Sequence, residues 1–314
     1  MDVSEVRMAE ILVCGEALVD LTAARCEGER GFVPRPGGSP FNVAIGLARL
    51  GTAAGFCGRV STDPFGRLLR RTLEADGVGT EWLSIADEPS PLAFVHLDAA
   101  GQAEYAFHFA GSAGASLRSS DVPQPLPDGV TAVHVGSIAL VLEPGAAVVA
   151  DLLAKAHRQG RVTSLDPNVR GRFIGDRAAY ASSLEQWVAQ SSVVKASTED
   201  LAWVWPDEDP AALARRWAAG GRLVVLTDGA RGALAVRGDE RHEIAARATS
   251  VIDTVGAGDA FTSGLLAALD AQGCLTPEGL EQADVRAAVS FAASVAAMTC
   301  TRAGADPPHR DELR

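Results

Sequence analysis

The sequence predicts an α/β fold, a three-layer α/β/α sandwich in which helices cover both faces of a mostly parallel central sheet. Three observations support it. From residue 130 onward, short β-branched runs alternate with longer amphipathic segments, the pattern of parallel strands joined by helices. Polar residues and glycines follow these strands directly. A pair of short apolar runs in the first third of the chain lies outside the alternation and predicts a small additional sheet.

The alternating elements can be placed in order along the chain. The short runs rich in valine are expected to be strands, at residues 130–135, 162–165, 193–196 and 223–227. The segments between them are expected to be helices, at residues 144–159 and 177–190 and in the segment that follows the strand at 193–196 and ends at about residue 219. Two late segments, 259–271 and 277–298, carry small residues throughout and are expected to form closely packed helices.

Two hairpins are expected beside these elements. Residues 92–97 and 104–109 flank a turn that contains glycine, and both carry aromatic residues or histidine at alternate positions. The second hairpin joins residues 233–237 to residues 241–245 through a turn at Gly238-Asp239. Histidines on the first hairpin, His96 and His108, are interpreted as surface residues rather than catalysts.

The first hairpin is expected to combine with residues 18–33 into a β-lid, because its phenylalanines need a surface to cover. An ordinary edge hairpin is the alternative. We therefore expect one domain over residues 1–314, with a discontinuous lid from about 16–36 and 91–112.

The composition limits the compartment and the partners. A net charge of −12 and a pI of about 5.0 argue against a nucleic-acid partner, although local geometry can still hold a single nucleotide. The first apolar run, residues 11–13, is too short for a signal peptide, and no stretch is long enough to span a bilayer. Five scattered cysteines favour reduced thiols over disulfides. We expect a cytoplasmic protein without a membrane partner.

The residues after the predicted strands indicate a binding site. In open α/β sheets, ligands bind at the carboxyl ends of the strands. Four such ends carry glycine or polar residues, at 136–137, 166–168, 195–199 and 227–229. Asp166 among them has two open interpretations, a residue that fixes a turn or one that lies near phosphates.

The strongest motif is Asp-Thr-Val-Gly-Ala-Gly-Asp-Ala-Phe at residues 253–261. Gly256 and Gly258 allow a tight turn and close approach of a ligand to the backbone. A helix that begins near Asp259 would direct free N–H groups at this loop, which is suited to an anion such as a transferring phosphoryl group. Asp259 could then act as a general base. The alternative is that Asp259 merely caps the helix.

A second motif, Gly-Gly-Ser-Pro-Phe-Asn at residues 37–42, precedes a helix that runs to about residue 50. Ser39 is expected to be its N-cap, with Pro40 at the first helical position. Asn42 falls in the first turn, where its amide can hydrogen-bond hydroxyl groups. A well-capped structural helix is the alternative.

Other nucleotide-binding motifs do not fit. Phe261 stands where a dinucleotide fingerprint needs its third glycine, and the loop comes late in the chain. The only two lysines, Lys155 and Lys195, do not follow a glycine-rich loop, which excludes a P-loop. Phosphoryl transfer would have to use backbone amides, arginines and a metal ion.

Taken together, these motifs resemble the signatures of the ribokinase-like carbohydrate kinases, the PfkB family. The likeness spans almost the whole chain. Within the family, the motifs at residues 15–20 and 166–170 are most similar to those of bacterial fructokinases and 2-keto-3-deoxygluconate kinases. The segments that carry the likeness are residues 15–20, 37–51, 166–170, 227–232, 253–261 and 301–305. The resemblance implies a ribokinase-like fold with a small β-sheet lid, and an enzyme that transfers the γ-phosphate of ATP to a primary hydroxyl of a sugar.

The resemblance also implies roles for individual residues. Asp259 would be the base and the amides of Gly256, Ala257 and Gly258 the anion hole, with Arg170 near the transferred phosphate. The sugar would contact Asp20, Gly37, Gly38 and Asn42. The nucleotide would contact Thr227, Gly229, Gly232 and Lys195. Asp253 and Val255 would lie in a loop for a monovalent cation such as K⁺. Many members position Mg²⁺ with Asn-x-x-Glu; here the matching stretch is Ala-Ser-Thr-Glu at 196–199, so only Glu199 carries over.

Several alternatives remain open at the level of sequence. Fructose is the expected substrate, and 2-keto-3-deoxygluconate, ribose or a nucleoside are alternatives. Arg35, Arg170 or Arg172 could pair with the carboxylate of a keto-acid sugar. A non-catalytic sugar or nucleotide sensor is possible on the same fold. Glu16 could place the substrate or be a buried paired carboxylate. The apolar lid suggests a homodimer.

Overall fold

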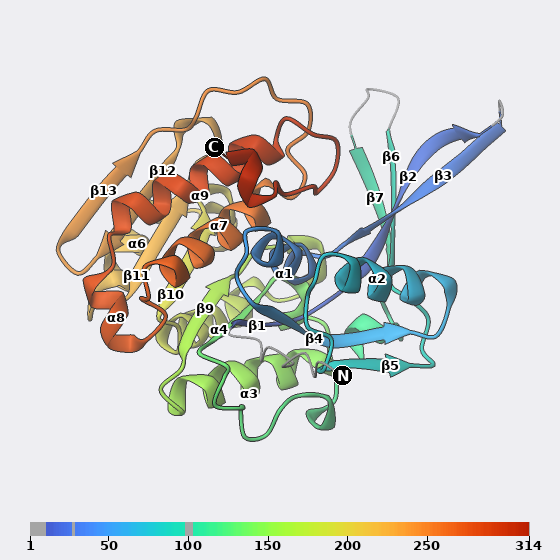
Figure 1. The fold of residues 1–314 in the computed structure, drawn as a ribbon, viewed down its shortest axis with the longest axis horizontal. Coiled ribbons are helices and arrows are strands. Elements are labelled where there is room, and N and C mark those ends of the chain that lie inside the picture. Colours follow the sequence, from blue (N-terminus) through green and yellow to red (C-terminus); the bar gives the residue numbers. More distant parts are fainter. Residues whose placement is uncertain (1–10, 27–28, 98–102, 314) are drawn as a thin grey trace, which may run out of the picture.

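The main sheet of the protein is mostly parallel. The structure, a computed structural model, describes residues 11–26, 29–97 and 103–313. In these residues the main sheet has nine strands, in the order β13-β12-β11-β10-β9-β8-β1-β4-β5 (Figure 1). Their bounds are β1 (Ile11–Cys14), β4 (Ala54–Ser61), β5 (Leu83–Ala86), β8 (Ala132–Gly136), β9 (Val162–Asp166), β10 (Val193–Ser197), β11 (Leu223–Thr227), β12 (Ala233–Arg237) and β13 (Glu240–Ile244). Neighbours pair in parallel from β5 to β11, and β12 and β13 add an antiparallel hairpin.

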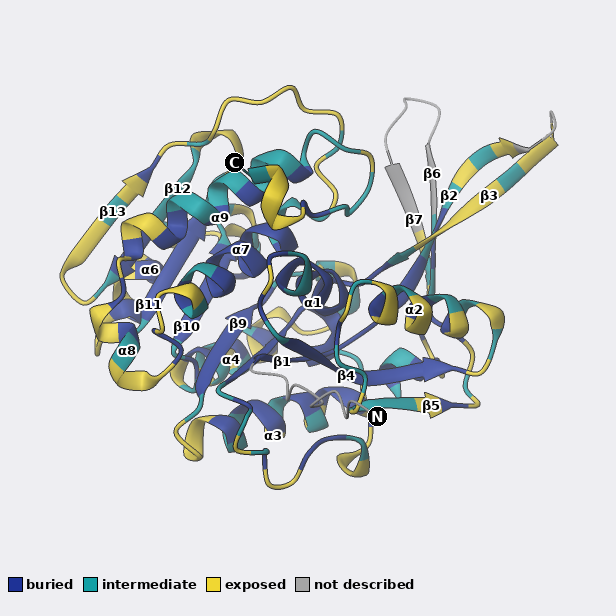
Figure 2. Ribbon diagram, viewed as in Figure 1, coloured by how far each residue is buried: buried dark blue, intermediate teal, exposed yellow. Residues whose placement is uncertain are grey.

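Helices cover both faces of this sheet, which confirms the predicted layers. One face packs against α1 (Ser39–Arg49), α2 (Pro64–Ala75), α7 (Ala257–Ala271), α8 (Pro277–Gln282) and α9 (Val285–Thr299). The other face packs against α3 (Gly145–Arg158), α4 (Arg177–Ala189), α5 (Thr198–Val204) and α6 (Pro210–Ala218). Because successive strand residues point to opposite faces, Ile11 and Val13 enter one core, whereas Leu12 and Cys14 enter the other. The strands in the middle of the main sheet are buried between the helices (Figure 2).

A four-stranded sheet stands beside the main body (Figure 1). Its order is β3-β2-β6-β7, and its strands are β2 (Leu18–Cys26), β3 (Glu29–Gly37), β6 (Leu92–Leu97) and β7 (Ala103–His108). Phe107 and Phe109 pack against Phe173 of the main body, with ring centroids 5.1 and 5.5 Å away. These aromatic contacts anchor the base of the small sheet. The limits of the lid and of a single 1–314 domain stay predictions, because residues 1–10, 27–28, 98–102 and 314 lie outside the described residues.

The sequence prediction of one helix over 277–298 was wrong. The segment divides into α8 and α9, with Ala283 and Asp284 between them. Asp284 is the N-cap of α9, where its carboxylate accepts the N–H of Ala287 at 2.9 Å. Aspartate favours this position because it satisfies a free N–H of the new first turn. The close packing expected of the late helices is present, since a Cβ on Gly264 of α7 would lie 2.9 Å from Ala292 Cα of α9.

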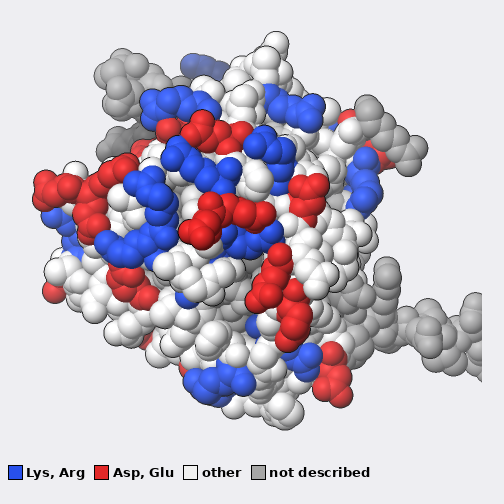
Figure 3. Space-filling view, turned by 90° about the vertical axis from the view of Figure 1, so that its left-hand side faces the viewer, with Lys and Arg blue, Asp and Glu red and all other residues white. Residues whose placement is uncertain are grey.

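Opposite charges are mixed on the face that carries β12, β13 and α6 (Figure 3). Exposed pairs there include Arg241 with Glu243 at 2.5 Å and Arg216 with Glu185 at 2.6 Å. Such exposed ion pairs contribute little to stability. Among the described residues, no helix combines the length and the apolar character needed to cross a lipid bilayer.

Candidate active site

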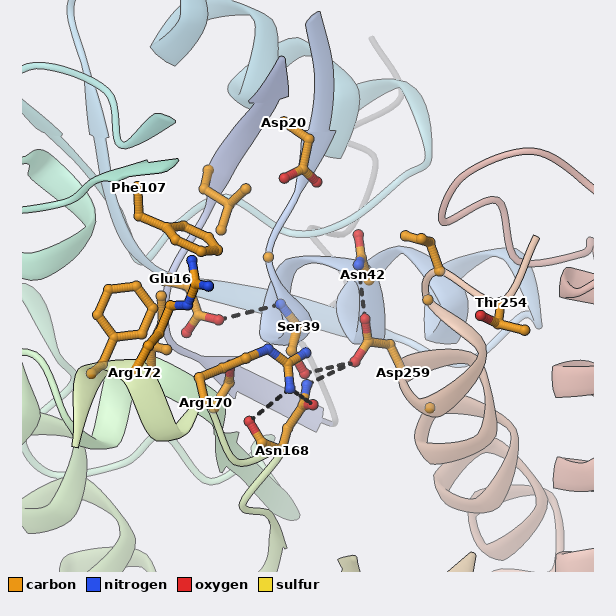
Figure 4. Close-up of a pocket in the computed structure, with 18 residues that line it drawn as sticks. Glu16, Asp20, Ser39, Asn42, Phe107, Asn168, Arg170, Arg172, Thr254 and Asp259 are labelled. Atoms are coloured by element: carbon orange, nitrogen blue, oxygen red, sulfur yellow. Dashed lines mark hydrogen bonds between the residues drawn. The ribbon is translucent and has the colours of Figure 1, made fainter. Parts of the chain in front are cut away.

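A cavity of about 440 Å³ lies at the carboxyl edge of the main sheet, beside the small sheet (Figure 4). Segments that are far apart in the sequence meet in its wall, because parallel strands place their carboxyl ends along one edge. The lining residues are Glu16, Leu18, Asp20, Gly38, Ser39, Asn42, Phe107, Ser137, Ile138, Asn168, Arg170, Arg172, Phe173, Thr254, Val255, Gly256, Gly258 and Asp259. Three of its polar side chains, those of Ser39, Asn42 and Asn168, meet at one carboxylate, that of Asp259.

Asp259 is held between side chains of the opposite wall (Figure 4). The Ser39 hydroxyl donates to Oδ1 at 2.7 Å, and the Asn42 amide donates to Oδ2 at 2.8 Å. Asn168 Nδ2 lies 3.5 Å from Oδ1. The residue is only 7% exposed. Burial raises the pKa of Asp259 to about 6, while the bonds from Asn42 and Ser39 oppose this rise. A carboxylate with this pKa is ionised at neutral pH and still basic enough to accept a proton.

The start of α7 presents backbone N–H groups to the cavity. Gly256 is its N-cap residue and has a left-handed conformation with φ 76°. A Cβ at Gly256 would lie 2.5 Å from Ala305 Cβ, so the position needs glycine for space as well as for conformation. The first N–H groups of a helix have no partner within the helix. This end of α7 can therefore bind an anion beside Asp259.

The start of α1 differs from the sequence prediction. The helix begins at Ser39 itself, the N-cap residue is Gly38, and no side chain caps the helix. Ser39 is therefore not the N-cap, and its hydroxyl instead donates to Asp259. The serine that looked like a structural cap is a residue of the site.

A buried ion pair lies behind the first turn of α7. Lys195 Nζ donates to Asp166 Oδ2 at 2.9 Å, and the Thr262 hydroxyl donates to the same oxygen at 3.1 Å. Burial by itself lowers the pKa of Lys195, but the charge and hydrogen bond of Asp166, together with the charges of Asp200 and Asp259, outweigh it and the pKa rises. A Cβ on Gly258 would lie 3.1 Å from Lys195 Nζ. Lys195 thus places a positive charge directly under the expected anion hole without lining the cavity.

The structure brings some of the sequence-predicted residues together and leaves others apart. Of the expected catalytic and sugar-binding residues, those that line the cavity are Asp259, Gly256, Gly258, Arg170, Asp20, Gly38 and Asn42. Ala257 opens α7 between two of them. Gly37 lies behind Asp20, where a Cβ would be 2.8 Å from Asp20 Oδ2. Burial raises the pKa of Asp20 to about 6.

The residues predicted for the nucleotide lie further along the sheet edge. Thr227 ends β11, and its hydroxyl donates to the Ala196 carbonyl at 3.3 Å. Gly229 and Gly232 bound the short turn η5 (Gly229–Arg231), both with positive φ. Gly232 borders a second cavity, of about 650 Å³, rather than the first.

The residue predicted for the magnesium ion does not line the cavity. Glu199 is exposed on α5. Asp200, one position later, accepts the N–H of Val169 at 2.9 Å. Burial raises the pKa of Asp200, and the charge of Asp166 raises it further. Asp200 is thus the carboxylate of this helix that lies close to the buried Asp166–Lys195 pair.

The predicted monovalent-cation loop is closed by Asp253. One carboxylate oxygen accepts the N–H of Val255 at 3.1 Å, and the other accepts the N–H of Gly304 at 2.7 Å. Val255 borders the cavity and is exposed. The Thr-Arg-Ala-Gly-Ala segment at 301–305 therefore supports the loop that precedes α7.

Sequence reasoning missed Ser39, Phe107 and Phe173 as residues of the site. Ser39 could have been found from its proximity to Asn42 in the motif, because residues three apart share one helix face. Phe107 lies on the hairpin whose phenylalanines were expected to cover a surface, whereas Phe173 carried no such signal. His108 is exposed, as expected of a surface residue, and its ring contacts Phe94. The side chain of His96 lies outside the described residues.

Comparison with known proteins agrees with this geometry. Residues 8–312 match the model of the pfkB family of carbohydrate kinases. A fructokinase of Rhizobium leguminosarum bv. trifolii is 40% identical over 279 residues, which cover 88% of this chain and 85% of that protein. The crystal structure of a Xylella fastidiosa fructokinase with bound ATP superposes with a TM-score of 0.87 at 29% identity, over 96% of both chains. A Vibrio cholerae fructokinase, solved with fructose, ADP and calcium ion, gives a TM-score of 0.85 at 31% identity over 98% of both chains. The chain belongs to the pfkB family of carbohydrate kinases.

Proposed function

We propose that this protein is an ATP-dependent fructokinase, which transfers the γ-phosphate of ATP to a primary hydroxyl of fructose, with Asp259 as the general base. The observation that carries the proposal is a buried, hydrogen-bonded carboxylate in the first turn of α7, in the wall of one cavity. Relatives and structural neighbours named fructokinase support the choice of sugar.

Each wall of the cavity has its part in this reaction. Asp20, Gly38 and Asn42 bind sugar hydroxyls, and Asp259 accepts the proton of the attacking hydroxyl. The amides at Gly256, Ala257 and Gly258 stabilise the charge on the transferring phosphoryl group. Arg170, at the cavity wall, and Lys195, beneath it, add positive charge on the side from which the nucleotide approaches. Thr227, Gly229 and Gly232 contact the rest of the nucleotide.

Mg²⁺ fits the carboxylates behind the cavity better than it fits Glu199. Mg²⁺ is usually held by one or two carboxylates together with water and substrate phosphates. Asp166 lies close enough to Asp200 for its charge to raise the pKa of Asp200. A cation between the two carboxylates would relieve this repulsion. We assign the water-mediated contacts to these two residues. The ion supplies neutralisation of phosphate charge. A monovalent cation such as K⁺ would bind at the loop of Asp253 and Val255 and order the amides of the anion hole.

A keto-acid sugar is the second candidate substrate. Arg170 and Arg172 both line the cavity and could pair with a carboxylate. Initial rates of ADP release on fructose, 2-keto-3-deoxygluconate, ribose and a nucleoside distinguish the candidates. Turnover of fructose above the others supports the proposal. Sugar and ATP binding without ADP release would instead support the sensor.

Asp259→Asn tests the catalytic assignment. The amide cannot accept the hydroxyl proton, so we expect kcat to fall by about 10²–10⁴, with the Kd for ATP changed by less than about twofold. The matched control is Asp176→Asn, because Asp176 caps α4 outside the cavity by accepting the N–H groups of Ala178 and Ala179. If Asp259 only capped its helix, both variants would retain kcat.

The assembly and the compartment are further parts of the proposal. Phe32 and Val33 on β3 are 48% and 39% exposed, and the Phe32 ring contacts Phe94 at 5.3 Å. We propose that this apolar surface of the small sheet pairs with a second copy of the chain, which light scattering would detect. The thiols of Cys14, Cys57, Cys274 and Cys300 are free, in keeping with a cytoplasmic location.

A further inference from the structure

Glu16 is a buried carboxylate that the proposed reaction does not use. It lies between β1 and β2 in the wall of the cavity and is 1% exposed. Oε1 accepts the N–H of Ser39 at 3.3 Å, and Oε2 accepts the N–H of Ala139 at 3.2 Å. Ser39 begins α1, and Ala139 belongs to the short helix η3 (Ser137–Leu140). One carboxylate thus joins the starts of two helices that both border the cavity.

Glu16 replaces the side-chain cap that α1 lacks. The N-cap residue Gly38 has no side chain, and Pro40 has no N–H to be satisfied. The two segments are also packed in contact. A Cβ on Gly38 would lie 2.6 Å from the Glu16 carbonyl oxygen, and a Cβ on Gly15 would lie 2.4 Å from Pro40 Cγ. The first turn of α1 therefore has its position fixed by the Gly15-Glu16 segment.

Ser39 connects this cap to the base. Its backbone N–H donates to Glu16, and its hydroxyl donates to Asp259 at 2.7 Å. Asn42, three residues further along the same helix, donates to the other oxygen of Asp259. A displacement of the first turn of α1 would move both donors of Asp259 together. The two carboxylates are mechanically linked through one residue.

We propose that Glu16 is a positioning residue for phosphoryl transfer, which in its ionised form fixes Ser39 and Asn42 and, through them, the carboxylate of Asp259. This inference rests on the proposed function of Asp259. A protonated Glu16 could accept less strongly from the two N–H groups, because one of its oxygens would become a donor. The first turn of α1 would then loosen, and the base would lose its alignment.

The charges around Glu16 come from several elements. Asp259 of α7 and Asp20 of β2 contribute negative charge to the same cavity, and Arg170 and Arg172 contribute positive charge from the segment after β9. Burial raises the pKa of Glu16 to about 7; the backbone and Ser137 hydrogen bonds oppose the rise, and the charge of Asp259 adds to it. The pKa values of Asp259 and Asp20 are both about 6. Glu16 is therefore the last of the three acids to ionise as the pH rises.

Glu16→Gln tests the inference through the pH dependence of kcat/KM for the sugar, at saturating ATP with Mg²⁺ in excess. For the wild type we expect the acid limb to have its midpoint near pH 7, set by Glu16. In Glu16→Gln the midpoint should move to about pH 6, where Asp259 and Asp20 titrate. The plateau should fall about tenfold, because glutamine can accept from only one of the two N–H groups.

Two further variants separate positioning from general stability. Glu16→Asp keeps an ionisable group but is one methylene shorter, so we expect a lower plateau with an acid limb whose midpoint stays above that of Glu16→Gln. Asp63→Asn replaces one acceptor oxygen of the carboxylate that caps α2, which accepts the N–H of Gly66 at 2.7 Å and that of Ser90 at 2.8 Å outside the cavity. This variant should lose stability and keep the wild-type midpoint.

An unchanged midpoint in Glu16→Gln would overturn the inference. A wild-type midpoint at or below pH 6 would also overturn it, and this measurement needs no variant. The proposed function is tested separately by Asp259→Asn. If that variant is inactive and Glu16→Gln shows no shift, Asp259 remains the base and only the role of Glu16 fails.

Discussion

At the scale of single residues, Lys195 shows that a residue expected near the nucleotide can also belong to a buried ion pair. The sequence places Lys195 at a strand end near the nucleotide, and the structure pairs it with Asp166 below the anion hole. Lys195 is 5% exposed and Asp166 is completely buried. Removing one member of a buried ion pair leaves an uncompensated charge, which costs far more than the pair itself contributes.

Lys195→Met should therefore lower the free energy of unfolding by about 3–5 kcal/mol. The double variant with Asp166→Asn should recover much of this loss, because no buried charge remains. Urea denaturation at pH 7 measures the free energy of unfolding of Lys195→Met, Asp166→Asn and the double variant. The double-mutant cycle then isolates the interaction energy of the pair. Equal and additive losses from the two single substitutions would contradict a direct Lys195–Asp166 interaction.

At the scale of elements, the start of α5 places Glu199 and Asp200 in different surroundings. Ser197 caps this helix by accepting the N–H of Asp200 at 3.0 Å, and Asp200 reaches back to the N–H of Ser197 at 3.4 Å. The serine and the acid three positions later form a capping box. The resemblance matches the family motif to residues 196–199 and so implies Glu199. A helix turns by 100° per residue, which is enough to move a side chain from the cavity side to solvent.

We expect Asp200→Asn and Glu199→Gln to differ sharply in their Mg²⁺ dependence. Asp200→Asn removes a charge that lies near Asp166, and it weakens the bond to the Val169 N–H. The Mg²⁺ concentration for half-maximal rate should rise by about 10–100-fold, as is typical for the loss of an outer-shell carboxylate. For Glu199→Gln, whose side chain is exposed, this Mg²⁺ concentration should change by less than about twofold. A larger effect at Glu199 than at Asp200 would restore the sequence assignment.

The other elements were predictable to different degrees. The strands from β8 to β11 follow from short valine-rich runs, and the hairpin of β12 and β13 follows from its Gly-Asp turn. The break between α8 and α9 was missed because apolar residues continue through it at helical spacing, and its only sign was Asp284 in a capping position. Alternating polarity places strands well, but it does not reveal where one amphipathic helix ends and another begins.

At the scale of the molecule, the sequence predicted which segments meet but not which atoms bond. The parallel sheet brings strand ends to one edge, and this places residues 15–20, 166–170 and 253–261 around one cavity. The bond between Ser39 and Asp259 joins residues 220 positions apart. No local pattern encodes such a pair, because it depends on how α1 and α7 pack against each other. The same packing buries Glu16, Asp20 and Asp259 around one cavity.

These three acids should make the protein less stable as the pH rises. Burial raises the pKa from 4.5 to about 7 for Glu16, and from 3.8 to about 6 for both Asp20 and Asp259. The folded state then binds more protons than the unfolded state between about pH 4 and pH 7, so the free energy of unfolding falls across this window. The pKa shift of Asp63 has the opposite sign. Hydrogen bonds from Gly66 and Ser90 lower its pKa despite burial, so its contribution is present at neutral pH and is lost in acid.

Asp259→Asn should consequently be inactive and yet more stable than the wild type at pH 8. The amide has no charge to bury, and the gain should be on the order of 2 kcal/mol, less any cost of realigning the Ser39 and Asn42 donors. At pH 4 the wild-type carboxyl is largely protonated in the folded state, so the gain should shrink. Urea denaturation at both pH values measures the difference, with Asp63→Asn expected to lose stability at pH 8. If Asp259→Asn were less stable than the wild type at pH 8, the carboxylate would be a stabilising cap rather than a base held in place at a cost to the fold.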